Sequence, residues 1–253
     1  MNYFKYETVD KKELLIQENF INILMELDSL IFDCDGVLLN TSKSFDQAIK
    51  YTIDYLFLNI FELQKPTKPF VTNEDIITLR NTGGLGNDWD LSFIIILYYF
   101  STILLKFQNS SKNKELIIQT IENLKTKFNT LQERIDQLKI FSNLFQRLEI
   151  SADDLTITKE EGPYTLFNLT KQMDASGIKS GGNVLLKWLD SNYKEIHKLW
   201  DKIEGLFGYD LPHLENLTKM VFEEIYLGSD GFKKIYNSKP LFFFGPGLIE
   251  NEF

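Results

Sequence analysis

The chain has 253 residues, which predicts one large domain or two small ones, and its hydrophobic content of 43% is sufficient for a buried core. Its formal net charge of −9 excludes a general nucleic-acid-binding protein, because such a protein presents a basic face to the phosphates. The single cysteine, Cys34, excludes an intrachain disulfide framework and favours a reducing, cytoplasmic setting.

Residues 11–27 have the apolar spacing of an amphipathic helix. Apolar residues of the stretch 11–27 fall mostly on one face of a helix, and charged residues fill the rest: Leu14, Leu15, Ile21, Leu24 and Met25. This spacing predicts a helix ahead of the first strand. The chain begins without the long apolar region that a signal peptide requires.

Two aspartates separated by one residue follow a short apolar run at residues 30–32. The run predicts a buried strand that ends at the first aspartate. Alternate residues of a strand point the same way, so Asp33 and Asp35 are expected to face one site. Gly36 permits the sharp turn by which the chain leaves the sheet. Such a carboxylate pair suits a hard divalent cation and a nucleophile–acid pair; the alternative is an acidic turn without chemistry.

Residues 29–41 resemble the first motif of the haloacid dehalogenase superfamily, in which two aspartates one residue apart precede a glycine and apolar residues. The resemblance implies an α/β, Rossmann-like core that carries a helical cap. It implies that Asp33 attacks phosphorus to form an aspartyl-phosphate, and that Asp35 protonates the leaving oxygen and then activates water. It also implies a Mg²⁺ cofactor, held by the Asp33 carboxylate and the Asp35 backbone carbonyl.

Helical spacing dominates the chain after residue 41. Apolar residues predict a helix across residues 45–57. Thr72 and Asp75 have the spacing of a capping box for a short helix that follows. The apolar run at residues 91–105 is about fifteen residues long and contains Ser and Thr, so it predicts a buried helix and not a membrane span.

A glycine-rich loop separates the last two of these helices. Its backbone N–H groups suit an anion, and the alternative is a plain turn between helices. The loop resembles a stretch in the helical cap of archaeal-type probable phosphatases of subfamily I, with these matching residues: Gly83, Gly84, Asn87, Asp88, Trp89, Asp90 and Leu91. Cap loops of that family face the active site. The resemblance therefore implies substrate contacts from Arg80, Gly83, Gly84 and Asn87.

A heptad pattern follows the polar break at residues 108–114, with these apolar positions: Ile117, Ile121, Leu124, Phe128, Leu131, Ile135 and Leu138. It predicts one long helix packed on neighbouring cap helices, and the alternative is a coiled coil between two copies of the chain. A further amphipathic helix is predicted at residues 214–227. Residues 246–249 resemble the segment that leads from the cap back to the core in the same family.

These patterns predict an α/β fold of the haloacid dehalogenase type with an incomplete Rossmann-like core and a large helical cap, in a chain that is itself predominantly α. Residues 1–41 are expected to form the first helix and strand of the core, residues 42–239 the cap, and residues 240–253 a return linker. The family's second to fourth motifs, which supply a Ser or Thr, a Lys and later acidic residues, cannot be assigned, so the second half of the catalytic core is expected to be absent.

The predicted function is that of a Mg²⁺-dependent phosphatase acting on a small phosphorylated metabolite. The missing motifs predict a second polypeptide that supplies the rest of the core, or self-association through the heptad helix. No nucleic acid and no membrane are expected as partners. The alternative is a non-catalytic helical interaction or regulatory subunit that retains the acid pair as a relic.

Overall fold

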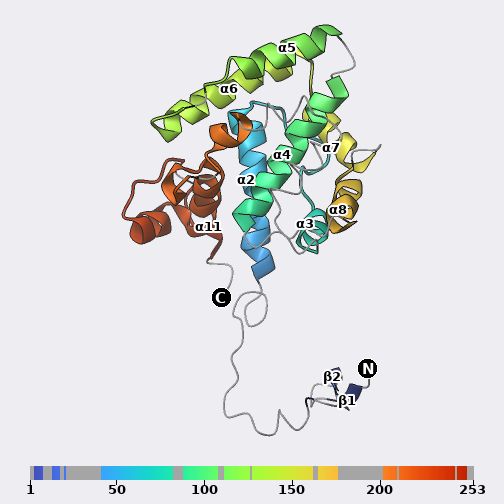
Figure 1. Ribbon diagram of the computed structural model, residues 1–253. Coiled ribbons are helices and arrows are strands. Elements are labelled where there is room, and N and C mark those ends of the chain that lie inside the picture. Colours follow the sequence, from blue (N-terminus) through green and yellow to red (C-terminus); the bar gives the residue numbers. More distant parts are fainter. Residues whose placement is uncertain are drawn as a thin grey trace. The chain divides into compact units, whose positions relative to one another are not determined.

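The computed structural model describes residues 3–7, 13–17, 20, 41–81, 88–107, 111–125, 127–161, 165–175, 202–209, 211–242 and 244–249. Contacts divide the chain into two compact units, Met1–Asn40 and Thr41–Phe253 (Figure 1). Each unit is described by itself. The predicted strand at residues 30–32 lies outside the described residues.

The first unit contains an antiparallel hairpin. Strand β1 (Tyr3–Glu7) pairs with β2 (Glu13–Gln17), and the register sets Phe4 opposite Ile16. The helix predicted across residues 11–27 is therefore wrong over β2. Aromatic and β-branched residues favour strands, and residues 3–7 provide a hydrogen-bonding partner that the one-dimensional helical pattern does not reveal.

The second unit is predominantly α-helical, as predicted for the chain. Among its described residues, the helices are α2 (Phe45–Tyr55), α3 (Asn73–Arg80), α4 (Asp88–Phe107), α5 (Ser111–Glu122), α6 (Leu131–Arg147), α7 (Ala152–Glu160), α8 (Leu166–Ala175) and α11 (Leu217–Tyr236). A π-helical turn, η3 (Leu56–Ile60), extends α2, and two 3-10 turns are η2 (Thr41–Lys43) and η4 (His213–Glu215). Within the described ranges, β1 and β2 are the only paired strands of more than a single bridge.

Helix α4 forms the centre of the second unit, where α2 lies beside it (Figure 1). Every residue from 91 to 103 is buried. The buried hydroxyls of Ser101 and Thr102 donate hydrogen bonds to the carbonyls of Leu97 and Tyr99, which satisfies these polar groups inside the core. The prediction of a buried helix is confirmed. Among the described helices, none is both long enough and apolar enough to cross a membrane.

The predicted capping box at the start of α3 is confirmed. The Thr72 hydroxyl accepts a hydrogen bond from the Asp75 backbone N–H, and the Asp75 carboxylate accepts one from the Thr72 backbone N–H. These reciprocal bonds satisfy two groups that have no partner within the helix. Local spacing was sufficient to locate this helix start.

The prediction of one long heptad helix is wrong, because α5 and α6 are separate helices that lie side by side (Figure 1). The Thr130 side chain caps α6 by accepting from the backbone N–H of Glu133. Lys202 donates to the carbonyl of Glu122 at the end of α5, where a cation is favourable. Ile121 and Leu138 are fully buried, so the seam packs within the chain.

Candidate functional site

The structure describes one of the six residues predicted to form the site. Asp33, Asp35, Gly83, Gly84 and Asn87 lie outside the described residues, and their roles stay predictions. Arg80 is the last residue of α3. The described residues with candidate functional roles are Arg80 and those that line a largely apolar groove of the second unit.

Arg80 holds together the ends of three helices. One guanidinium nitrogen lies 2.7 Å from the Asp46 carboxylate in the first turn of α2, and another lies 2.6 Å from the Asp88 carboxylate in the first turn of α4. Burial tends to lower the pKa of Arg80, but the hydrogen bond that it donates to Asp88 and the charges of both carboxylates raise it overall. The two carboxylates also stand where helix dipoles favour negative charge.

This arrangement gives Arg80 a positioning role in the second unit. Two carboxylates more than offset its single positive charge, so an anion would have to compete with both of them for the guanidinium. Substrate contact by Arg80 stays a prediction. The acidic residues in the first turns of α2 and α4 were the sequence signal for these ion pairs, but spacing along the chain does not reveal which arginine they meet.

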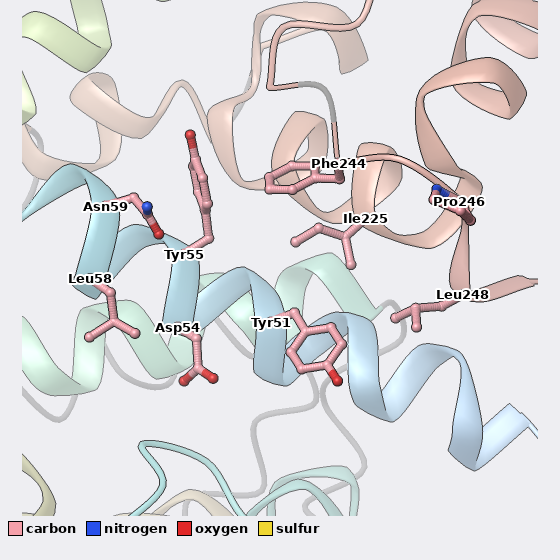
Figure 2. Close-up of a pocket in the computed structure, with 9 residues that line it drawn as sticks. All are labelled: Tyr51, Asp54, Tyr55, Leu58, Asn59, Ile225, Phe244, Pro246 and Leu248. Carbon is pink, nitrogen blue, oxygen red and sulfur yellow. The ribbon is translucent and has the colours of Figure 1, made fainter. Parts of the chain in front are cut away.

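A largely apolar groove runs between α2 and the segment after α11 (Figure 2). We call residues 240–242 and 244–249 the tail, and this cavity the α2–tail groove. Its volume is about 330 Å³. The α2 and η3 side is lined by Tyr51, Asp54, Tyr55, Leu58 and Asn59, and the opposite side by Ile225, Phe244, Pro246 and Leu248.

A buried carboxylate holds the tail in place. Glu224 on α11 is fully buried, and its two carboxylate oxygens accept hydrogen bonds from the backbone N–H groups of Leu241, at 2.5 Å, and Phe242, at 2.7 Å. Hydrogen bonds to an ionised acceptor are stronger than neutral ones. The Tyr55 ring packs edge-on against Phe242 and Phe244, with ring centroids 5.2 and 4.9 Å away. The tail wall of the groove is thus fixed by polar and aromatic contacts.

Two glycines let the tail cross α11 at close range. Gly228 has φ +71° and interrupts the helical backbone of α11. A Cβ introduced at this position would collide with the backbone at Gly247. A Cβ on Gly247 would in turn collide with the backbone at Leu227. The Ser229 backbone N–H donates to the Gly245 carbonyl at 2.9 Å beside this crossing. Glycine is required here because there is no room for a side chain.

Gly247→Ala is expected to displace the tail and to lower the free energy of unfolding by about 1–3 kcal/mol, because the added methyl group overpacks the crossing. Hydrogen exchange should then speed up at the amides of Ser229, Leu241 and Phe242. Gly205→Ala is the matched control, since a Cβ there meets no atom within 4 Å. Unchanged exchange in Gly247→Ala would contradict the close crossing.

A second cavity of about 630 Å³ surrounds Arg134 on α6. Arg134 donates to the Gly205 carbonyl, and its guanidinium lies 4.9 Å from the centre of the Phe128 ring. The lining also carries Lys127 and the acidic residues Glu204 and Glu215, so its two positive and two negative charges balance. The arginine is engaged in joining α6 to the helical segment at residues 202–207 and is not displayed to a ligand.

The α2–tail groove, unlike the second cavity, is lined by one carboxylate, that of Asp54, and by no lysine or arginine. Burial raises the pKa of Asp54, and the charges of Lys65 and Lys50 only partly oppose that rise. Burial and the nearby Glu224 charge raise the pKa of the Tyr55 hydroxyl. Asp54 is therefore a partly desolvated carboxylate on a largely apolar surface.

In comparisons with known proteins, no protein-family model, no curated protein and no solved structure matches this chain. Among the described residues, no group of three or more His, Cys, Asp or Glu side chains is placed to hold a metal ion.

Proposed function

We propose that this chain supplies the acid pair and helical cap of a haloacid-dehalogenase-like phosphohydrolase that acts on a small phosphorylated metabolite. One observation carries the proposal: Asp33 and Asp35 follow an apolar run, and the chain then enters a helical unit at Thr41. A helical insertion directly after the first motif is the arrangement that the resemblance implies. The predominantly α-helical second unit supports the cap assignment.

In the proposed reaction, a carboxylate oxygen of Asp33 forms a bond to phosphorus while the ester oxygen leaves. Asp35 gives its proton to that oxygen. Asp35 then takes a proton from water as the water attacks phosphorus, which releases phosphate and restores the Asp33 carboxylate. Asp33 and Asp35 offer the oxygen donors that Mg²⁺ prefers, and the bound ion would screen negative charge between carboxylate and substrate.

The proposal also requires groups that these 253 residues do not evidently provide. Thr218, Lys219 and Asp230 lie within α11, as do Lys233 and Lys234, so none of them ends a strand. Phosphoryl transfer depends on positioned charges around the transferred group. We assign the missing lysine and acidic residues to a second polypeptide or to sequence beyond this chain.

The heptad pattern no longer favours the alternative interpretation of the chain as a helical interaction subunit. Its heptad positions include Ile117, Ile121 and Leu138, which are buried within the chain. They are not displayed for pairing with a second copy. A phosphatase assay distinguishes a catalytic acid pair from one that is retained without catalysis.

An aryl phosphate assay with Mg²⁺ tests the proposed function on residues 1–253 alone and mixed with the product of any adjoining reading frame. We expect little or no turnover by the chain alone, because loss of a single charge-stabilising group typically costs about 10²–10³ in rate and several would be missing. Turnover is expected in the complemented mixture. Robust hydrolysis by the chain alone would contradict the missing-core proposal, and inactivity with every complement would favour the non-catalytic alternative.

A further inference from the structure

The α2–tail groove combines one carboxylate with an apolar wall. Figure 2 shows Tyr51 between Asp54 and Leu248, with Ile225 and Phe244 nearer to Tyr55; all of these residues line the groove. Residues three apart on a helix are neighbours on its surface, and Tyr51 and Asp54 both line the groove. The groove therefore has a negatively charged edge, an aromatic centre and an apolar far side.

The Asp54 carboxylate lacks a close partner within the described part of the chain. No hydrogen bond and no ion pair to it occurs there. The two lysines that influence it are held elsewhere or exposed: Lys50 donates to the Asn73 side chain at 2.5 Å, and Lys65 is exposed. A partly desolvated carboxylate gains most from a ligand that brings its own positive charge.

The aromatic and apolar lining favours the same kind of ligand. Tyr51 is 48% exposed and lines the groove, and aromatic faces attract ammonium groups. Ile225, Phe244 and Leu248 offer an apolar surface for the rest of the molecule. A volume of about 330 Å³ is at the small end of the range typical of ligand sites. The Glu224 bonds hold the tail wall in place before a ligand arrives.

We propose that the α2–tail groove binds a small organic cation, with its ammonium group at Asp54 and Tyr51 and its apolar body against Ile225, Phe244 and Leu248. The site belongs wholly to the second unit and is independent of the proposed phosphohydrolase function. The charge of Asp54 selects a cation over a neutral or anionic molecule of the same shape.

The test uses three probes of similar shape on the full chain: phenethylammonium, phenethyl alcohol and phenylacetate. Binding is followed by amide chemical shifts in NMR titrations. We expect phenethylammonium to shift the amides of Tyr51, Asp54, Tyr55 and Phe244, with an affinity at least about tenfold above that of the alcohol. Phenylacetate should bind more weakly than either.

Two variants distinguish the effect of the Asp54 carboxylate from the effect of the protein's net charge. Asp54→Asn should abolish the preference for the cation over the alcohol, and Asp136→Asn, which removes an exposed carboxylate on α6, should leave it intact. Burial raises the folded-state pKa of Asp54, so its ionised form opposes folding at neutral pH and the Asn variant should fold normally. Equal affinity for all three probes, a preference that survives in Asp54→Asn, or an absence of shifts at the groove would each overturn the proposal.

Discussion

Asp33→Asn is expected to lower phosphate-ester hydrolysis by roughly a thousandfold or more in any preparation in which the wild-type chain supports turnover. The amide has nearly the same shape as the carboxylate but cannot attack phosphorus, so the substitution removes the nucleophile and preserves local packing. Initial rates with an aryl phosphate and Mg²⁺ measure the effect. Circular dichroism checks that the helical content is unchanged.

Asp28→Asn is the matched control for this substitution. It removes the same charge five positions earlier in the chain, outside the predicted acid pair, and is expected to leave hydrolysis nearly unchanged. Asp35→Asn should also cripple turnover, because the proton donor for the leaving oxygen is lost. Hydrolysis at the wild-type rate by Asp33→Asn would rule out the covalent mechanism.

Lys159→Met is expected to destabilise the second unit by about 3–5 kcal/mol, because it breaks a buried ion pair and leaves one charge uncompensated. Lys159 on α7 is 6% exposed; its ammonium lies 2.6 Å from the Asp75 carboxylate and donates to the Phe70 carbonyl at 3.1 Å. The same carboxylate oxygen serves the capping box of α3. Urea unfolding measures the free energy of unfolding.

Lys68→Met is the matched control for the buried lysine. Lys68 pairs with Glu160 at the surface, and its side chain is 56% exposed, so water screens the interaction and the substitution should change stability little. Asp75→Asn combined with Lys159→Met should recover part of the loss, since no buried charge is then left unpaired. Equal destabilisation by Lys68→Met and Lys159→Met would contradict the importance of burial.

Local signals account for the helices that the sequence predicted correctly. The Thr72 and Asp75 spacing is sufficient for a capping box, and the uninterrupted apolar run of α4 is sufficient for a buried helix. Residues 214–227 were predicted as an amphipathic helix and lie mostly within α11. These features depend on neighbours within one or two turns, which a sequence displays directly.

Other features were missed. Residues 13–17 form a strand because they pair with β1, and the heptad pattern is divided where Thr130 caps a second helix through the nearby Glu133. Sequence spacing did not reveal that Glu224 holds the tail or that Gly228 and Gly247 meet. Such contacts arise from packing between segments far apart in the chain.

The candidate site residues also include some that a local motif predicts and some that only tertiary packing reveals. Asp33 and Asp35 were predicted from a motif and lie outside the described residues, whereas Asp54 carries no local signal that separates it from other acidic residues of the helices. Its distinction comes from apolar residues supplied by α11 and the tail. Arg80 was predicted as a substrate contact, and the structure adds its two carboxylate partners.

Titration of the full chain with Mn²⁺ as a paramagnetic substitute for Mg²⁺ tests the central claim most directly, because it locates a metal site at the acid pair without requiring turnover. We predict NMR line broadening centred on the amides of residues 33–36, competition by Mg²⁺, and loss of the broadening in Asp33→Asn. Broadening centred on other acidic residues, or an absence of broadening at residues 33–36, would contradict a catalytic acid pair in this chain.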